Sequence, residues 1–442
     1  MELAGMRVMV VGLGVSGLAA AHLLATRGAK LVMTDSRVDL AHDNLPPGEL
    51  HLGSDDPAWL AGVELVVVSP GVPPSSPLLH AARIAQIPII GELELGSRFV
   101  DAPLVAVTGT NGKSTVTVML GAIFRTAGMK TFVGGNLGTP LADAAGPEFD
   151  VAVVEVSSYQ LETIVEFHPR VAIHLNLTDD HLDRYRDLAE YGRAKARLFE
   201  RQDATDWAIL NRDDAEVWRL APRVAARVFS FGMRPPVAST GSAIWAEAGA
   251  LTFDHEGRRG AIATRNFKLP GAHNLLNAMA ASAAALAMGV APETIERALA
   301  EFAGLPHRIE FVRDRGGVTY VDDSKGTNVG AVVEALAAMQ APVILIAGGM
   351  DKGGGYEPLR APLREKVRLA ILIGAAREQM RAALDGVTEI VCVATLADAV
   401  ALAASRARAG DTVLLSPACS SFDQFKNYAE RGRIFKELVL AL

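Results

Sequence analysis

The chain has 442 residues, of which 50% are hydrophobic and 21% are charged, and this composition is typical of a packed globular protein and not of a disordered one. Its formal net charge of −7 argues against nucleic acid as a partner, so an anionic substrate would need local positive groups. The two cysteines, Cys392 and Cys419, offer neither a disulfide framework nor a metal-ligand spacing.

Two long stretches, residues 8–25 and 275–292, contain no Asp, Glu, Lys or Arg. Glycines interrupt the first, and no small-residue cleavage site follows it. The second consists mostly of alanine, which is too weakly apolar for a membrane span and fits a buried helix better. We therefore expect a soluble, cytoplasmic protein without an export signal or membrane insertion, and a monomer.

Short β-branched runs alternate with longer helical patterns along almost the whole chain. In chain order, strands are predicted at residues 7–11, 30–34, 64–69, 87–90, 104–108, 150–156, 171–177, 207–211, 318–322, 343–347, 369–373, 389–393 and 412–415. Helices are predicted at residues 16–27, 114–126, 274–288 and 328–339. Strands separated by helices imply right-handed parallel crossovers, and hence doubly wound α/β sheets.

The pattern divides into three α/β domains, predicted at residues 1–92, 93–303 and 304–442. The first and third are expected to be Rossmann-like, and the central one to be of the P-loop type. Within the central domain, residues 234–260 are rich in Pro, Gly, Ser and Thr, which favours surface turns with a small hairpin.

The first glycine-rich loop, GLGVSG at residues 12–17, follows a strand and opens a helix, and Asp35 ends the next strand. This context matches the dinucleotide fingerprint, in which glycines let the backbone approach a diphosphate at a helix N-terminus. The loop therefore predicts a ligand that bears a diphosphate. A redox cofactor, a UDP-sugar and a tight turn that binds nothing all stay open.

The second loop, TGTNGKST at residues 108–115, follows an apolar strand and precedes an amphipathic helix. Backbone N–H groups of such a loop hold phosphates, the lysine reaches the outer ones, and the hydroxyl can meet Mg²⁺. Its spacing is shorter than that of the standard P-loop. The loop predicts ATP binding by Gly109, Thr110, Asn111, Gly112, Lys113, Ser114 and Thr115.

That octapeptide resembles the nucleotide loop of the Mur ligase and folylpolyglutamate synthetase superfamily, and the resemblance extends along essentially the whole chain. It is carried by GLGVSG at 12–17, DSR at 35–37, EVSSYQLE at 155–162, NLTDDHLDRY at 176–185, GLPHR at 304–308, DSKGTN at 323–328 and SPACSSFDQFKNY at 416–428. Within the family these segments look most similar to the member that adds D-glutamate. The L-alanine-adding relative would carry a histidine-rich segment in place of DSKGTN, and the diaminopimelate- or lysine-adding relatives have a different N-terminal domain.

The resemblance implies ATP-dependent ligation of D-glutamate to UDP-N-acetylmuramoyl-L-alanine in peptidoglycan precursor synthesis. ATP would activate the carboxylate as an acyl phosphate, which the amino group would then attack. The first domain would bind the UDP part of the substrate, the second ATP and the third the amino acid. The diphosphate at the first loop would accordingly belong to UDP and not to a nicotinamide cofactor.

The catalytic set that the resemblance implies is Lys113, Glu155, His181 and Lys195, with Ser114, Glu155, His181 and Lys195 holding Mg²⁺ at two sites. Glu155 also ends an apolar strand that faces the nucleotide loop, where a hard oxygen ligand is suitable. Lys195 aligns with a lysine that relatives use as a carbamate. Carbamylation needs a neutral amine, whereas free lysine has a pKa of about 10.4, so a desolvated pocket is expected.

The remaining site residues also come from the resemblance. The UDP substrate would contact Gly14, Val15, Ser16, Asp35, Ser36, Arg37, Gly71, Asn136, Ser157 and Gln160. Asn274 and Asn277 would approach the adenine, Arg308 the phosphates and Asp323 the ribose of ATP. D-Glutamate would meet Lys325, Thr327, Lys352, Ser421, Phe422 and Tyr428. Two positions depart from the family pattern: Met350 stands where an acidic or small residue is expected, and Tyr428 where phenylalanine is commoner.

Three alternatives remain at this stage. An NAD(P)-dependent oxidoreductase would explain the first loop but leaves the second loop and the C-terminal third without a role. A non-catalytic nucleotide-binding scaffold is disfavoured because Lys113, Glu155, His181 and Lys195 are all present. A sister ligase is nearest: folylpolyglutamate synthetase lacks the UDP-type first domain, and a variant that adds L-glutamate stays open.

Overall fold

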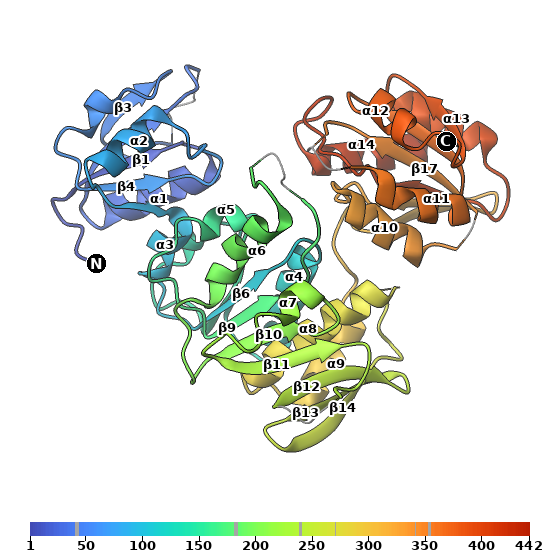
Figure 1. The fold of residues 1–442 in the computed structure, drawn as a ribbon, viewed down its shortest axis with the longest axis horizontal. Coiled ribbons are helices and arrows are strands. Elements are labelled where there is room, and N and C mark those ends of the chain that lie inside the picture. The colour runs from blue at the N-terminus through green and yellow to red at the C-terminus, as the bar shows by residue number, and fades with distance from the viewer. Residues whose placement is uncertain (40–43, 181–183, 238–240, 270, 341, 352–354) are drawn as a thin grey trace. The chain divides into compact units, whose positions relative to one another are not determined.

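The computed structural model describes residues 1–39, 44–180, 184–237, 241–269, 271–340, 342–351 and 355–442 (Figure 1). The chain forms two compact units. The first consists of residues 1–176, 192–267 and 277–301, and the second of residues 177–191, 268–276 and 302–442. Three α/β sheets lie in these units, in agreement with the predicted fold class.

The N-terminal sheet, blue in Figure 1, has five parallel strands in the described residues, in the order β3-β2-β1-β4-β5. They are β1 (Arg7–Val11), β2 (Lys30–Asp35), β3 (Glu49–Leu52), β4 (Leu65–Val68) and β5 (Ile89–Gly91). The helices are α1 (Val15–Thr26), η1 (Pro57–Leu60), α2 (Pro77–Ile84) and α3 (Glu92–Ser97). The strand order reverses between β1 and β4, and ligands of doubly wound sheets bind at such a switch point.

The central sheet has nine strands in the described residues, in the order β14-β13-β12-β11-β10-β9-β6-β8-β7. They are β6 (Leu104–Thr108), β7 (Thr131–Gly135), β8 (Val151–Glu155), β9 (Val171–His174), β10 (Trp207–Asn211), β11 (Arg227–Gly232), β12 (Ser242–Glu247), β13 (Ala250–His255) and β14 (Arg258–Ala263). The helices are α4 (Lys113–Thr126), η2 (Leu141–Ala144), α5 (Ser158–Leu161), α6 (Leu188–Ala196), η3 (Arg197–Phe199), α7 (Ala215–Trp218), α8 (Ala272–Ala287) and α9 (Pro292–Glu301). Strands β12, β13 and β14 pair antiparallel, so the predicted small hairpin is one of two.

The C-terminal sheet, orange to red in Figure 1, has six strands in the described residues, in the order β15-β16-β20-β17-β18-β19. They are β15 (Glu310–Arg315), β16 (Val318–Asp322), β17 (Val343–Gly348), β18 (Val367–Ile373), β19 (Glu389–Cys392) and β20 (Thr412–Leu415). The helices are α10 (Val329–Ala338), η4 (Glu357–Leu359), α11 (Arg360–Lys366), α12 (Arg377–Ala383), α13 (Leu396–Arg406) and α14 (Tyr428–Ala441). Only β15 runs antiparallel to its neighbour.

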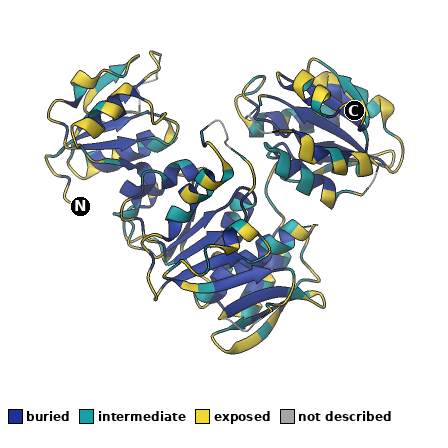
Figure 2. Cartoon of the chain, viewed as in Figure 1, coloured by how far each residue is buried: buried dark blue, intermediate teal, exposed yellow. Residues whose placement is uncertain are grey.

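Both faces of the terminal sheets are covered, so alternate residues of one strand belong to different cores. Val8 and Val10 pack in one cluster and Met9 and Val11 in another. The C-terminal sheet repeats this along β17, whose strand residues are dark blue in Figure 2. Continuous apolar strands are what a sheet buried on both faces requires.

The strands of long apolar runs are confirmed, and those missed are shorter or more polar. The predicted strands 7–11, 104–108, 207–211, 318–322 and 412–415 match the observed bounds. Strands β3, β7, β11 and β15 were not predicted. Two of these, β3 and β15, contain no fully buried residue, because they lie at sheet edges. The domain boundaries after residues 92 and 303 stay predictions.

The uncharged stretch at residues 275–292 falls in α8, where Ala278 and Ala280 are fully buried, as the alanine-rich pattern predicts. In the described parts of the chain, none of the helices has the length and apolar character that a bilayer crossing requires. Cys419 is buried, whereas Cys392 is only partly so.

Candidate active site

The nucleotide loop connects β6 to α4. Gly112 precedes α4 with φ of +83°, and a β-carbon there would lie 2.4 Å from Oδ1 of Asn277, so only glycine fits. Asn176, which follows β9, ties the loop down: its Oδ1 accepts from the Asn111 N–H at 2.8 Å, and its backbone oxygen accepts from the Thr110 N–H at 3.0 Å. Asn176 is in the NLTDD segment but was not among the predicted site residues.

Two predicted catalytic lysines meet at one carbonyl oxygen. Nζ of Lys113 donates to the carbonyl oxygens of Gly109 and Thr110 at 2.9 and 2.8 Å. Nζ of Lys195 donates to the same Gly109 oxygen at 2.8 Å. The Lys195 side chain, on α6, is only 1% exposed, which is the desolvated setting that the sequence predicted. Ser114 and Thr115 are buried in the first turn of α4.

Glu155 lies at the end of β8, next to β6, as predicted. Its Oε1 accepts a 2.7 Å hydrogen bond from the side-chain amide of Asn136. Its Oε2 is buried and, within the described residues, makes no hydrogen bond. A buried carboxylate oxygen without a partner is costly unless a cation reaches it, so this donor suits the Mg²⁺ that the family implies.

His174, the last residue of β9, was not predicted as a site residue. Its ring is 1% exposed, and neither ring nitrogen has a hydrogen-bond partner among the described residues. Burial, together with the positive charges of Lys195 and Lys113, lowers the pKa of His174 to about 3, so the imidazole is neutral. The ring stacks on Phe199, with 6.5 Å between the centroids. This buried histidine is therefore close enough to Lys113 and Lys195 for their charges to act on it.

The predicted UDP-site residues of the first sheet gather at the carboxyl ends of neighbouring strands. Gly14, Val15 and Ser16 follow β1, Ser36 and Arg37 follow β2, and Gly71 follows β4. Asp35 makes hydrogen bonds within this loop, and its predicted contact with the substrate stays a prediction. Its Oδ2 accepts from the Leu13 N–H at 2.7 Å, and Arg37 donates to both of its oxygens at 2.8 Å. The Arg37 guanidinium lowers the pKa of Asp35 to about 2. Asp35 thus organises this loop.

Ser157 and Gln160, predicted to contact the muramoyl part, bond to each other in a capping box at the start of α5. Oε1 of Gln160 accepts from both the backbone N–H and the hydroxyl of Ser157, each at 3.0 Å. The pair follows β8 directly, so it lies close in sequence to Glu155.

The second unit holds the other predicted nucleotide residues. Asn274 is buried near the start of α8. Arg308 donates to Oε2 of Glu334 at 3.2 Å. Asp323 is fully buried, and its oxygens accept from the Ser416 hydroxyl at 2.7 Å and the Ile309 N–H at 3.2 Å. Burial raises the pKa of Asp323 to about 6.

Most of the residues predicted to bind D-glutamate lie in loops that follow the carboxyl ends of strands in the C-terminal sheet. Lys325 and Thr327 follow β16, and Ser421 and Phe422 follow β20, the neighbouring strand. Nζ of Lys325 donates to the Tyr428 hydroxyl at 3.0 Å and lies 4.4 Å from the centroid of its ring. His181 and Lys352 lie outside the described residues.

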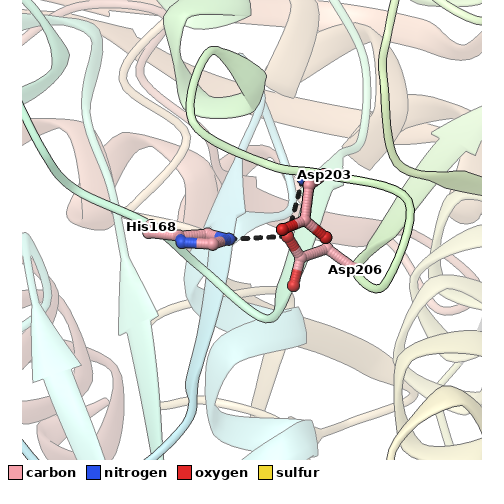
Figure 3. A group of neighbouring side chains, drawn as sticks. All are labelled: His168, Asp203 and Asp206. Carbon is pink, nitrogen blue, oxygen red and sulfur yellow. Dashed lines mark hydrogen bonds and ion pairs between the residues drawn. The ribbon is translucent and has the colours of Figure 1, made fainter.

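A different cluster, His168, Asp203 and Asp206, offers three potential metal ligands near the start of β10 (Figure 3). The Asp206 carboxylate is already bound: its Oδ2 is 2.6 Å from Nε2 of His168 and accepts from the Asp203 N–H at 2.8 Å. Arg170 donates to its Oδ1 at 3.3 Å. Because His168, Arg170 and the Asp203 N–H already bond the Asp206 carboxylate, we interpret the cluster as structural.

Three family models match the chain in order. They are the Mur ligase MurD-like N-terminal domain at residues 6–91, the Mur ligase middle domain at 107–285 and the Mur ligase glutamate ligase domain at 307–419. The chain is 47% identical to the UDP-N-acetylmuramoylalanine–D-glutamate ligase of Geobacter metallireducens, covering 100% of this chain and 99% of the relative. The chain belongs to the Mur ligase family. The ligase of the same name from Geotalea uraniireducens is also 47% identical to this Mur ligase, with the same coverage.

Solved structures agree on the fold of this Mur ligase. A pseudomurein peptide ligase type C from Methanothermus fervidus has a TM-score of 0.64 and 18% identity, covering 99% of this chain and 100% of the other. The UDP-N-acetylmuramate-alanine ligase from Thermotoga maritima has a TM-score of 0.61 and 18% identity, covering 99% of both chains. At this identity the likeness shows the fold alone.

Proposed function

We propose that this Mur ligase joins D-glutamate to UDP-N-acetylmuramoyl-L-alanine at the expense of ATP, in the cytoplasmic synthesis of peptidoglycan precursors, and acts as a monomer. The observation that carries the proposal is the 47% identity over the whole length of both chains to curated D-glutamate ligases. The meeting of Lys113 and Lys195 at the nucleotide loop supports catalysis over a scaffold role.

The reaction has two steps. A carboxylate oxygen of the muramoyl-L-alanine attacks the γ-phosphorus of ATP, which forms an acyl phosphate and releases ADP. The amino group of D-glutamate then attacks the acyl carbon, the C–O bond to phosphate breaks, and the nitrogen loses a proton as the amide forms. Lys113 supports the first step, because its ammonium can leave the Gly109 and Thr110 carbonyl oxygens and disperse charge on the phosphates.

The residues present fit the implied Mg²⁺. Ser114, Glu155, His181 and Lys195 in its carbamate form would hold the ion at two sites, where it would neutralise negative charge on the phosphoryl oxygens. Oε2 of Glu155, which is buried and makes no hydrogen bond to any described residue, supports this assignment. Forming the carbamate joins Nζ of Lys195 to the carbon of CO₂ and releases a proton. The almost complete burial of Lys195 is the desolvated setting expected for this modification.

The substrate sites follow the carboxyl ends of the strands. We assign the UDP part to the loops that hold Val15, Ser16, Ser36, Arg37 and Gly71, and the muramoyl part to Asn136, Ser157 and Gln160. The nucleotide loop, Asn274, Asn277, Arg308 and Asp323 are assigned to ATP. Lys325, Thr327, Lys352, Ser421, Phe422 and Tyr428 are assigned to D-glutamate, whose two carboxylates need cations and hydroxyl donors.

The test is phosphate release from ATP with Mg²⁺, bicarbonate and UDP-N-acetylmuramoyl-L-alanine, with D-glutamate, L-glutamate, L-alanine or meso-diaminopimelate added singly. Stimulation by D-glutamate alone is expected, and a Lys113→Met variant should abolish it. Stimulation by L-glutamate alone would move the protein to a variant ligase. No stimulation in folded protein would overturn the proposal.

A further inference from the structure

Arg431, in the first turn of α14, is a buried cation whose role the proposed function does not explain. Its side chain is 1% exposed. Within the described parts of the chain, no carboxylate lies within ion-pair distance of it; Asp423, Asp322 and Asp323 act on it only at longer range. Burial lowers its pKa to about 10, so it remains charged at neutral pH. Buried charges are normally paired, so this one must serve another purpose.

Among the described residues, the guanidinium donates to acceptors in two loops. From the loop after β16, the Ser324 hydroxyl accepts from Nε at 3.0 Å and the Ser324 carbonyl oxygen from Nη2 at 2.9 Å. From the loop after β20, the Cys419 carbonyl oxygen accepts from Nη1 and Nη2, both at 3.3 Å, and the Ser420 oxygen from Nη1 at 3.4 Å. Because β16 and β20 are neighbours, Arg431 links the loops of two adjacent strands.

A third loop, after β17, is bonded to Ser420, whose carbonyl oxygen also accepts from Arg431. The backbones of Met350 and Ser420 exchange two hydrogen bonds, of 2.9 and 3.0 Å. Gly349 has φ of +140°, and a β-carbon there would lie 2.2 Å from the Ser420 carbonyl oxygen and 3.3 Å from Nη1 of Arg431. The loop therefore approaches as closely as it does because it has no side chain there. Two loops thus bond the guanidinium directly, and the third is bonded to one of them through Ser420.

These are the loops to which the amino acid is assigned. Lys325 follows Ser324, Ser421 follows Ser420, and Tyr428 stands three residues before Arg431. The Ser324 hydroxyl also donates to the Tyr428 carbonyl oxygen at 2.8 Å, so the loop after β16 is bonded to the first residue of α14 as well. Arg431 therefore bonds the residues that directly precede Lys325 and Ser421 in the chain.

We propose that Arg431 is a positioning residue for a dicarboxylic amino acid: it bridges the loops after β16 and β20, to which the loop after β17 is bonded, and so fixes the spacing of the loops assigned to the two carboxylates. This inference rests on the proposed function. Arg431 does not itself touch the substrate. The planar fork of arginine is needed because one group must serve several carbonyl oxygens at fixed angles.

The test measures kcat and the KM values for ATP, UDP-N-acetylmuramoyl-L-alanine and D-glutamate. It compares the full-length enzyme with the variants Arg431→Met and Arg431→Lys and with the matched control Arg433→Met. Arg433 lies two residues further along α14, is exposed and pairs with Glu437 at 2.6 Å. Arg431→Met should raise the KM for D-glutamate by about tenfold or more, with the other two KM values within about twofold of wild type. The KM of Arg431→Lys for D-glutamate should lie between those of wild type and Arg431→Met, and the KM values of Arg433→Met should match wild type.

Equal changes in all three KM values, or a lower melting temperature with unchanged KM values, would show a merely structural role and overturn the inference. Should Arg431→Met fail to fold, Arg431→Lys and Ser324→Ala decide by the same KM pattern, because each removes only part of the network. Failure of the proposed function is distinguishable, since wild-type enzyme would then not respond to D-glutamate at all.

Discussion

The side-chain amide of Asn136 lies 2.7 Å from Oε1 of Glu155 and holds that carboxylate so that its other oxygen, Oε2, remains buried and, in the part of the chain described, without a hydrogen bond. Asn136 is thus an orienting partner, and Oε2 is the oxygen left for a cation. In many metal sites, a second residue hydrogen-bonds to a metal-binding side chain and orients it in this way.

Glu155→Gln tests this arrangement. The amide keeps the shape and the acceptor for Asn136 but loses the charge at Oε2, so kcat should fall by about 100-fold or more and half-maximal activity should need more Mg²⁺. The measurement is phosphate release across a Mg²⁺ titration, with circular dichroism to check the fold. Wild-type turnover of this variant at saturating Mg²⁺ would contradict a metal role for Glu155.

Lys195→Arg tests the carbamate. Arginine keeps the positive charge and a donor for the Gly109 carbonyl oxygen, but its guanidinium does not form a carbamate. We expect wild-type enzyme to show a carbamate ¹³C resonance in labelled bicarbonate and activity that rises with bicarbonate. The variant should lack the resonance and lose about 100-fold in kcat. A resonance that persists in the variant would place the modification on another residue.

His174→Leu should reduce the acid sensitivity of the fold. The folded pKa of His174 is about 3, below the unfolded value of about 6.5, so the unfolded chain binds the proton first and stability falls as pH decreases between these values. Leucine does not titrate and removes two unpartnered ring nitrogens. Between pH 7 and 5.5 the free energy of unfolding should therefore fall by about 1 kcal/mol less than in wild type. Urea unfolding at the two pH values measures this, with exposed His80→Leu as the control, which should follow wild type.

Glu92→Gln should stabilise the protein above neutral pH. Burial raises the pKa of Glu92 to about 7, against about 4.5 unfolded, so its contribution is full below pH 4.5 and is lost as pH rises through 7. Glutamine carries no charge and keeps an oxygen for the Ala142 N–H, which donates to Oε1 at 2.7 Å. The variant should gain about 1–3 kcal/mol at pH 8 and little at pH 4.5, measured by urea unfolding.

Glu94→Gln is the matched control on the same helix, and it should change the free energy of unfolding in the opposite direction. The Glu94 carboxylate accepts from the backbone N–H groups of Val165 and Phe167 at 2.8 and 3.0 Å and from Nε of Arg98 at 2.7 Å. Removing its charge weakens every one of these bonds, so this variant should lose stability at pH 8. Equal effects of the two substitutions would contradict the assignment of Glu92 as a desolvated acid.

Motifs made the principal elements and most candidate residues predictable, because a glycine loop between a strand and a helix has both a local signature and a defined chemistry. Lys113 could be named in this way, whereas Glu155 and Lys195 were named as catalytic candidates from the resemblance to the Mur ligase family. The motif did not specify the contacts within the protein: Asp35, predicted to meet the substrate, also bonds Leu13 and Arg37 within its own loop. Partner choice among short loops depends on distances of a few ångströms, which sequence spacing does not specify.

His174 and Arg431 had no signal of this kind. His174 is a single polar residue at the end of an apolar strand, and its importance comes from α6, which the fold brings against it. Arg431 and Arg433 are two residues apart on one helix and equally polar, yet the first is buried and the second exposed. The helical period distinguishes them: Arg431 lies on the face of α14 that also carries the buried Phe435 and Val439, whereas Arg433 lies off that face.

The shared acceptor of the two catalytic lysines has a consequence for how the cell's carbon dioxide supply acts on this enzyme. While both ammonium groups donate to the Gly109 carbonyl oxygen, each is held there against the repulsion of the other. The proposed carbamylation of Lys195 would replace one of these charges with an anion and leave Lys113 as the only one of the two ammonium groups at this oxygen. By thermodynamic reciprocity, the factor by which the modification alters ATP affinity is the factor by which ATP alters the uptake of CO₂. Nucleotide and dissolved CO₂ would then act as mutual effectors, without a separate regulatory site.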